Sequence, residues 1–240
     1  MISLRTDRFT YFEYETVSIE GYICNDTNES KTVAVLFELY QNNKLILSNK
    51  INVLMESNHV TYIGNAEFTA PKVNGREKFN LKAVILDGDM VITYNMQTIE
   101  IFENIEIPDI KIIKLDIGEH YIAGEKVIVK PCGMLPLHFV SRNTGHRAVK
   151  EFSPYDFSYW YNKKKDMITP VLETTFEAEG FTPILTSGNI DKNGKWKKTL
   201  ACAEKIYKGK RYIICQLDLR CENPVAAKFI NNISSADETR

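Results

Sequence analysis

The chain has 240 residues, of which 44% are hydrophobic and 25% charged, and this composition is typical of a globular protein that folds without disulfides or metal ions. Its 30 Lys and Arg residues nearly cancel its 31 Asp and Glu residues, so no basic field favours a nucleic-acid partner. No apolar run approaches membrane-spanning length, and the five cysteines form no Cys-x-x-Cys pair, so we expect reduced thiols, no membrane and a cytoplasmic location.

The first half of the chain alternates between apolar and polar residues. Val17–Ile23, Val33–Leu39, Tyr62–Phe68 and Phe79–Ile85 each place apolar side chains at every second position. This period is typical of half-buried strands, and Asp87-Gly88-Asp89 between two apolar runs indicates a hairpin. Seven or eight such strands predict an immunoglobulin-like all-β sandwich over residues 1–104.

The alternation stops near Pro108, which sets a domain boundary, and the composition changes after it. Short apolar runs predict strands at 110–115, 126–130, 137–140, 172–178, 183–186 and 211–217, whereas 155–165 fits a short helix or a loop and 198–207 fits a helix or a strand. Asn223 and Pro224 begin a helix that carries Val225, Phe229 and Ile230 on one face. We therefore predict a small α/β domain over residues 110–233 and a mobile tail over 234–240.

Three of these apolar runs end in polar clusters. The clusters are Ser141–His146, Ser187–Asn189 and Asp218. If the strands are parallel, their carboxyl ends share one edge, where α/β domains bind ligands. This reasoning predicts a crevice that includes His138, His146 and Asp218.

The aromatic and polar residues near these ends are candidates for carbohydrate contact. Trp160 and Trp196 could stack on sugar rings, with Arg142 and Asn189 supplying polar groups. The alternative is that the two aromatic side chains are buried between domains.

No reaction follows from the motifs. His138, Arg142 and His146 recur at four-residue steps, but they lie on a strand and loop and lack the His-Glu-x-x-His pattern of a zinc site. Phosphate-binding glycine loops, the Gly-x-Ser-x-Gly nucleophile turn and an evident facing pair of carboxylates are missing from the sequence. We assign no catalytic residue, no metal site and no cofactor.

Several segments resemble the carboxyl-terminal region of bacterial glycoside hydrolase family 2 proteins, which are β-galactosidase-like. The segments are His138–His146, Tyr155–Tyr161, Ala178–Asn189 and Cys215–Leu219, and the first half is similar to the immunoglobulin-like domain that follows the catalytic barrel in that family. The resemblance spans nearly the whole chain. Independently of the resemblance, the suggested parallel strands with short connecting helices predict that residues 110–233 are an incomplete relative of flavodoxin-like or amidotransferase-like folds.

The catalytic glutamates of that family lie on a (β/α)8 barrel, for which these 240 residues leave no room. The resemblance thus implies a non-catalytic accessory portion whose partners are a glycosidase barrel and carbohydrate. Two alternatives stay open: a free-standing carbohydrate-binding or scaffold protein, and an independent hydrolase that uses the strand-end crevice.

Overall fold

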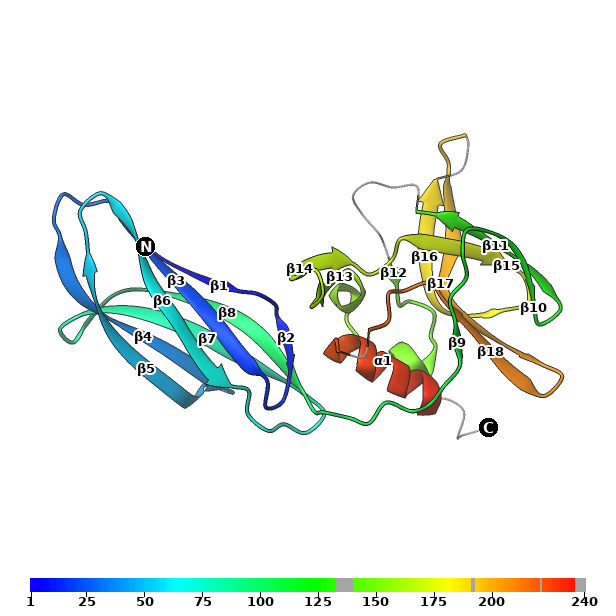
Figure 1. Ribbon diagram of the computed structural model, residues 1–240, viewed down its shortest axis with the longest axis horizontal. Coiled ribbons are helices and arrows are strands. Elements are labelled where there is room, and N and C mark those ends of the chain that lie inside the picture. The colour runs from blue at the N-terminus through cyan, green and yellow to red at the C-terminus, as the bar shows by residue number, and fades with distance from the viewer. Residues whose placement is uncertain (133–139, 191–192, 221, 236–240) are drawn as a thin grey trace. The chain divides into compact units, whose positions relative to one another are not determined.

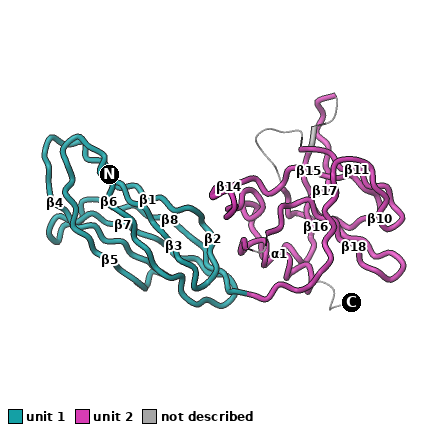
Figure 2. Tube along the Cα trace, in the orientation of Figure 1, with its two compact units in different colours: residues 1–104 teal, residues 105–240 magenta. Residues whose placement is uncertain are grey.

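The computed structural model describes residues 1–132, 140–190, 193–220 and 222–235. The chain divides into two compact units, residues 1–104 and 105–240, which Figure 2 shows in different colours. Both are built mainly from β-strands. None of the helices within the described residues is long and apolar enough to cross a membrane.

The first unit is an immunoglobulin-like β-sandwich (Figure 1). One sheet has the order β1-β3-β6 and the other has the order β2-β8-β7-β4-β5. The neighbouring strands are antiparallel except β2 and β8, which are parallel. The strands are β1 (Ile2–Thr6), β2 (Thr10–Phe12), β3 (Thr16–Asn25), β4 (Lys31–Gln41), β5 (Lys44–Met55), β6 (His59–Thr69), β7 (Arg76–Asp87) and β8 (Met90–Phe102).

The alternating residues of the first half form the core between these sheets. Ile19, Phe37, Leu81 and Ile99 are among the buried side chains, each at most 5% exposed. The predicted hairpin is also confirmed, because β7 ends at Asp87, β8 begins at Met90, and Gly88 between them has a φ of 59°. A positive φ is the conformation that glycine adopts most readily.

The second unit is centred on an eight-stranded sheet. Its main path is β10-β11-β15-β17-β16-β12, and β18 joins β17 to β9. A separate hairpin is formed by β13 and β14. The elements are β9 (Ile112–Ile113), β10 (Gly118–Ile122), β11 (Glu125–Pro131), β12 (Val140–Ser141), η1 (Arg147–Val149), η2 (Pro154–Phe157), β13 (Tyr159–Asn162), β14 (Met167–Pro170), β15 (Thr174–Ala178), β16 (Thr182–Ile190), β17 (Trp196–Tyr207), β18 (Lys210–Cys215) and α1 (Pro224–Ser235).

The predicted parallel sheet of the second unit is wrong. Among the strand pairs that the structure describes there, only β18 and β9 are parallel. The α/β class is therefore not confirmed for this unit, and the segment at 198–207 is a strand rather than a helix. Short buried apolar runs look alike in parallel and antiparallel sheets, and this similarity explains the error.

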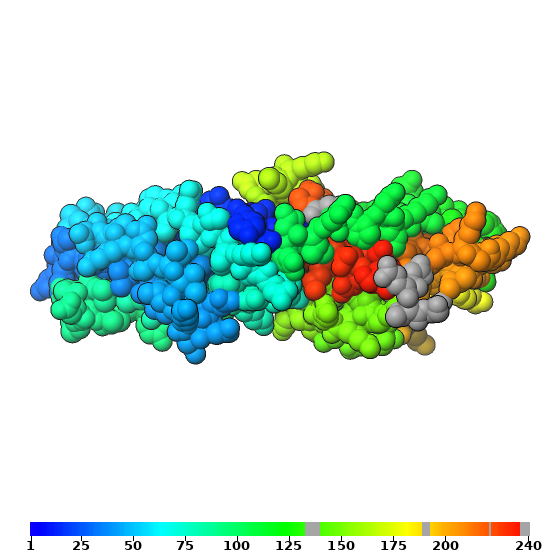
Figure 3. All heavy atoms as spheres, turned by 90° about the horizontal axis from the view of Figure 1, so that it is seen from below, coloured from blue at the N-terminus to red at the C-terminus, as the bar shows by residue number. Residues whose placement is uncertain are grey.

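The carboxyl-terminal helix α1 is confirmed. The side-chain oxygen of Asn223 accepts hydrogen bonds from the backbone N–H groups of Val225, at 3.0 Å, and Ala226, at 3.3 Å, as an N-cap should. The predicted apolar face is buried, and its Phe229 ring lies 5.1 Å from Phe157 and 6.0 Å from Phe152. Figure 3 shows α1, in red, at the surface between green segments of the same unit. It continues to Ser235, so the first two residues of the predicted tail are helical, and 236–240 lie outside the described residues.

Candidate functional site

The predicted strand-end crevice is not formed. β12 is antiparallel to β16, with Val140 opposite Ser187 and Ser141 opposite Thr186, so the chain leaves β12 toward the beginning of β16. Arg142 continues this register toward Leu185, about 13 Å along the strand from Asn189 at a rise of ~3.3 Å per residue. Arg142 therefore lies toward the beginning of β16 and Asn189 at its end, so the two residues do not share one edge of the sheet.

The other crevice residues also separate. His146 lies in a depression of about 440 Å³ with Thr182 and Glu204, whereas Asp218 lies beside Trp160 in a crevice of about 10 Å³, a volume for at most one water. Asp218 forms an ion pair with Arg220. His138 lies outside the described residues.

The two tryptophans have different environments. Trp160 is 6% exposed, its indole N–H donates to the backbone oxygen of Asp156 at 2.6 Å, and its ring lies 6.4 Å from Phe157. It is therefore a core residue. Trp196 is 56% exposed at the start of β17, and its ring lies across Gly188 of β16, where a Cβ atom would come within 1.6 Å of it. Of the two tryptophans predicted to contact carbohydrate, only Trp196 is exposed to solvent.

A buried charge cluster connects four elements around Glu204 of β17. One carboxylate oxygen lies 3.4 Å from Nε2 of His146, and the other accepts from Nε of Arg211, on β18, at 2.7 Å. The side chains of Glu204, His146 and Arg211 are 8%, 11% and 11% exposed. Arg211 also donates to the backbone oxygen of Ile233 at 2.9 Å, so the cluster holds the carboxyl end of α1.

The hydrogen bonds define the protonation state of this cluster. Nδ1 of His146 accepts from the backbone N–H of Ala148 at 3.2 Å, so the ring proton is on Nε2 and points to Glu204. The hydrogen bond from His146, together with the hydrogen bond and charge of Arg211, lowers the pKa of Glu204 to about 2 against the opposing effect of burial. Glu204 is therefore an ionised carboxylate with both oxygens engaged, which is the arrangement of a structural clamp.

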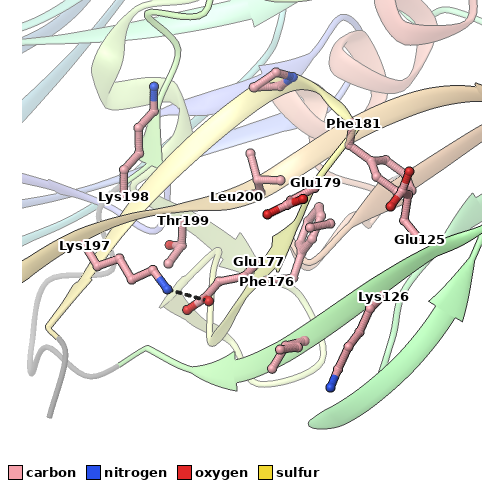
Figure 4. Close-up of a pocket in the computed structure, with 13 residues that line it drawn as sticks. Glu125, Lys126, Phe176, Glu177, Glu179, Phe181, Lys197, Lys198, Thr199 and Leu200 are labelled. Atoms are coloured by element: carbon pink, nitrogen blue, oxygen red, sulfur yellow. Dashed lines mark hydrogen bonds and ion pairs between the residues drawn. The ribbon is translucent and has the colours of Figure 1, made fainter.

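A larger groove of about 600 Å³ lies beside this cluster, and Pro183 borders both depressions. Figure 4 shows Glu177 and Lys197 at one end of the groove and Glu125 with Phe181 at the other. Glu177 lies 2.6 Å from the ammonium of Lys197 and 3.1 Å from that of Lys130. Burial acts to raise the pKa of Glu177, but the two lysines together lower it below its ordinary value.

The rest of the groove combines apolar and charged groups. Lys205 forms an ion pair of 2.6 Å with Glu125, and its ammonium lies 5.9 Å from the centre of the Phe181 ring. The hydroxyl of Thr199, a residue only 4% exposed, has no hydrogen-bond partner in the structure. This oxygen is itself buried from solvent, so Thr199 lines the groove without offering its hydroxyl to it.

The sequence signals for these sites were weak. Glu204 follows Ala201, Cys202 and Ala203 in a run that fits a buried strand, and a carboxylate there requires a buried cation. That signal could have identified Glu204, whereas its partners come from distant segments.

No family model matches this sequence, and no curated protein matches it. Among solved structures, the chain is similar to the CARDB domain of the PF1109 protein from Pyrococcus furiosus, in complex with di-metal ions, with 10% identity, coverage of 44% of this chain and 92% of that one, and a TM-score of 0.31. The periplasmic chaperone SfaE has 9% identity, coverage of 90% and 99%, and a TM-score of 0.28. Chicken CNTN1 FN1-FN3 domains have 8% identity, coverage of 87% and 62%, and a TM-score of 0.24. Because these TM-scores are below 0.5, we infer nothing about function from the likenesses.

Proposed function

We propose that this chain is a non-catalytic accessory module that belongs to a family 2 glycoside hydrolase and packs beside its catalytic barrel. The resemblance of the second half to that family motivates the proposal. The observation that carries the non-catalytic part of the proposal is the ionisation of Glu204. A buried carboxyl group is the kind of group that a glycosidase uses as its acid, but Glu204 is ionised.

Glycoside hydrolysis commonly uses two carboxyl groups, one of which keeps a proton near neutral pH because its pKa is raised. The pKa of Glu204 is lowered to about 2, and the pKa of Glu177 is lowered as well. Each carboxylate contacts two basic side chains. Neither group can act as the acid of such a pair, and both are suited to holding strands and loops together.

A direct test is hydrolysis by the purified chain. We expect no turnover of aryl β-galactosides, β-glucosides or β-mannosides above the buffer rate. Turnover that is lost in Glu204→Gln or Glu177→Gln would overturn the non-catalytic assignment, because those variants remove the nominated carboxylates while a contaminating enzyme would be unaffected.

A second test addresses the barrel. Sequencing of the gene region upstream of the codon for Met1 should reveal an in-frame (β/α)8 barrel, or a separately encoded barrel should co-purify with the tagged chain. Absence of both would remove the accessory role and leave a free-standing module.

Carbohydrate binding is the second candidate function, and the groove beside Glu177 favours it. A saccharide offers hydroxyl groups to the carboxylates and ammonium groups of the groove and an apolar ring face to its apolar side chains. Calorimetric titration with galactose, lactose and longer oligosaccharides should show heat that is lost in Glu177→Gln. The exposed control Glu173→Gln should retain it, and no heat across the panel would end this candidate.

A further inference from the structure

The outer face of the five-stranded sheet in the first unit carries apolar and charged side chains, and those of its outer strands β5 and β8 are exposed. Core residues occupy the odd positions of β4 and β7, so the even positions point away from the core. Tyr94 and Met96 of β8 are 61% and 54% exposed, and Leu45 of β5 is 46% exposed. We call this surface the outer sheet face, and it consists of Ala34, Leu36, Glu38, Tyr40, Leu45, Lys50, Lys82, Val84, Leu86, Val91, Tyr94 and Met96.

The strand register arranges these residues in rows across β5, β4, β7 and β8 (Figure 1). One row is Lys50, Leu36, Val84 and Tyr94. The next is Ser48, Glu38, Lys82 and Met96. In each row, the two inner residues are directly opposite one another on β4 and β7.

This arrangement makes the face complementary to itself. A two-fold axis that runs along the strands, between β4 and β7, exchanges the inner members of each row. Glu38 of one copy then faces Lys82 of the other, and Leu36 faces Val84. The same operation exchanges β5 with β8, so the exposed ammonium of Lys50 faces the aromatic ring of Tyr94, a favourable cation–π arrangement. Opposite charges and apolar groups thus meet their complements at the two inner positions of both rows, whereas Ser48 faces Met96 at the outer positions of the second row.

The face has the dimensions of a weak interface. Four strands at ~4.8 Å and six residues at ~3.4 Å give about 20 Å by about 20 Å in projection, or about 400 Å² per copy, before the relief of the side chains is added. Stable interfaces bury roughly 800 Å² per partner, so we expect a weak, concentration-dependent dimer. Two stacked sheets also pack naturally at ~10 Å with their strands nearly aligned, as the two-fold axis requires.

We propose that the outer sheet face binds a second copy of this chain, forming a two-fold dimer with a dissociation constant on the order of 10 µM. The contact pairs Glu38 with Lys82 twice and covers Leu36, Tyr94 and Met96, while Val84 is already only 4% exposed in the single chain. The isologous geometry uses the same patch on both subunits, as in most protein dimers.

Charge reversal tests this geometry by sedimentation velocity on the full chain between about 1 and 300 µM. Glu38→Lys and Lys82→Glu each place like charges opposite one another, and each should weaken dimerisation at least tenfold. The double variant Glu38→Lys/Lys82→Glu restores opposite charges across the axis and should return to within about threefold of the wild type.

Two further variants test whether dimerisation depends on the outer sheet face or responds to any exposed tyrosine that is replaced by glutamate. Tyr94→Glu should also weaken the dimer at least tenfold, whereas Tyr62→Glu, which alters a 52% exposed tyrosine on β6 of the other sheet, should leave it unchanged. Thermal melts confirm that each variant is folded. A wild-type chain that stays monomeric throughout, a dimer indifferent to all three face variants, or single-variant defects without rescue in the double variant would each overturn the proposal.

Discussion

Replacing Glu204 by glutamine tests whether the buried cluster stabilises the second unit. A pKa of about 2 in the folded chain, against 4.5 for an ordinary glutamate, corresponds to about 3 kcal/mol of stabilisation at neutral pH. The side chain is only 8% exposed, so solvent screens this contribution little. Glu204→Gln also leaves the guanidinium of Arg211 without its carboxylate, so we expect a loss of about 3 kcal/mol at pH 7.

The pH dependence has a definite sign. Because the pKa is depressed on folding, the contribution is present above the unfolded pKa near 4.5 and is lost as the pH falls toward 2. At pH 3, about 2 kcal/mol of it should be gone in the wild type, so the difference between the wild type and Glu204→Gln should shrink to about 1 kcal/mol.

Urea unfolding followed by tryptophan fluorescence measures this difference in the second unit alone, since Trp160 and Trp196 both lie in residues 105–240. Glu179→Gln, an exposed glutamate after β15, is the matched control and should change stability by less than about 0.5 kcal/mol. A similarly small effect for Glu204→Gln at pH 7, or an unchanged difference at pH 3, would refute the reasoning.

Three other predictions concern single features of the second unit. Asn223→Ala removes the cap of α1 and should cost about 1 kcal/mol in the same urea assay, whereas Asn223→Asp, which keeps the accepting oxygen, should lose less. Gly188→Ala should push the Trp196 ring off β16 and move its fluorescence emission to longer wavelength in a Trp160→Phe background; an unchanged spectrum would contradict the ring placement. Burial raises the pKa of Cys202 well above its usual range, so this thiol and the buried Cys215 should resist iodoacetamide in the folded chain and react in urea, as peptide mass mapping would show; equal labelling in both states would be inconsistent with their burial.

The sandwich was predictable because its signal is local. A strand with one face on the core alternates residue by residue, and Phe79–Ile85 shows this alternation without knowledge of its partners. The helix after Asn223 was equally readable, since the cap, the proline and the apolar stripe lie within eight residues.

The direction of the strands in the second unit was not predictable in this way. Ile184–Thr186 and Ile213–Leu217 are buried at every position, and a continuous buried run does not indicate which neighbouring strand it pairs with or in which direction. The polar residues after them were therefore assigned to one edge, although the antiparallel order of β12 and β16 separates Arg142 from Asn189. The Glu204 cluster was missed for a related reason, because His146 and Arg211 approach Glu204 from different segments.

The parallel pair of β2 and β8 also determines when the first unit can be completed during synthesis. Thr10 of β2 lies in register with Glu100 of β8, so β2 leaves the ribosome 90 residues before the strand with which it pairs. At ~5–20 residues per second, that interval lasts about 5–18 seconds. The sandwich therefore closes only as translation passes its last strand, and a nascent chain arrested before Glu100 would leave the segment around Tyr11 open to proteases and chaperones.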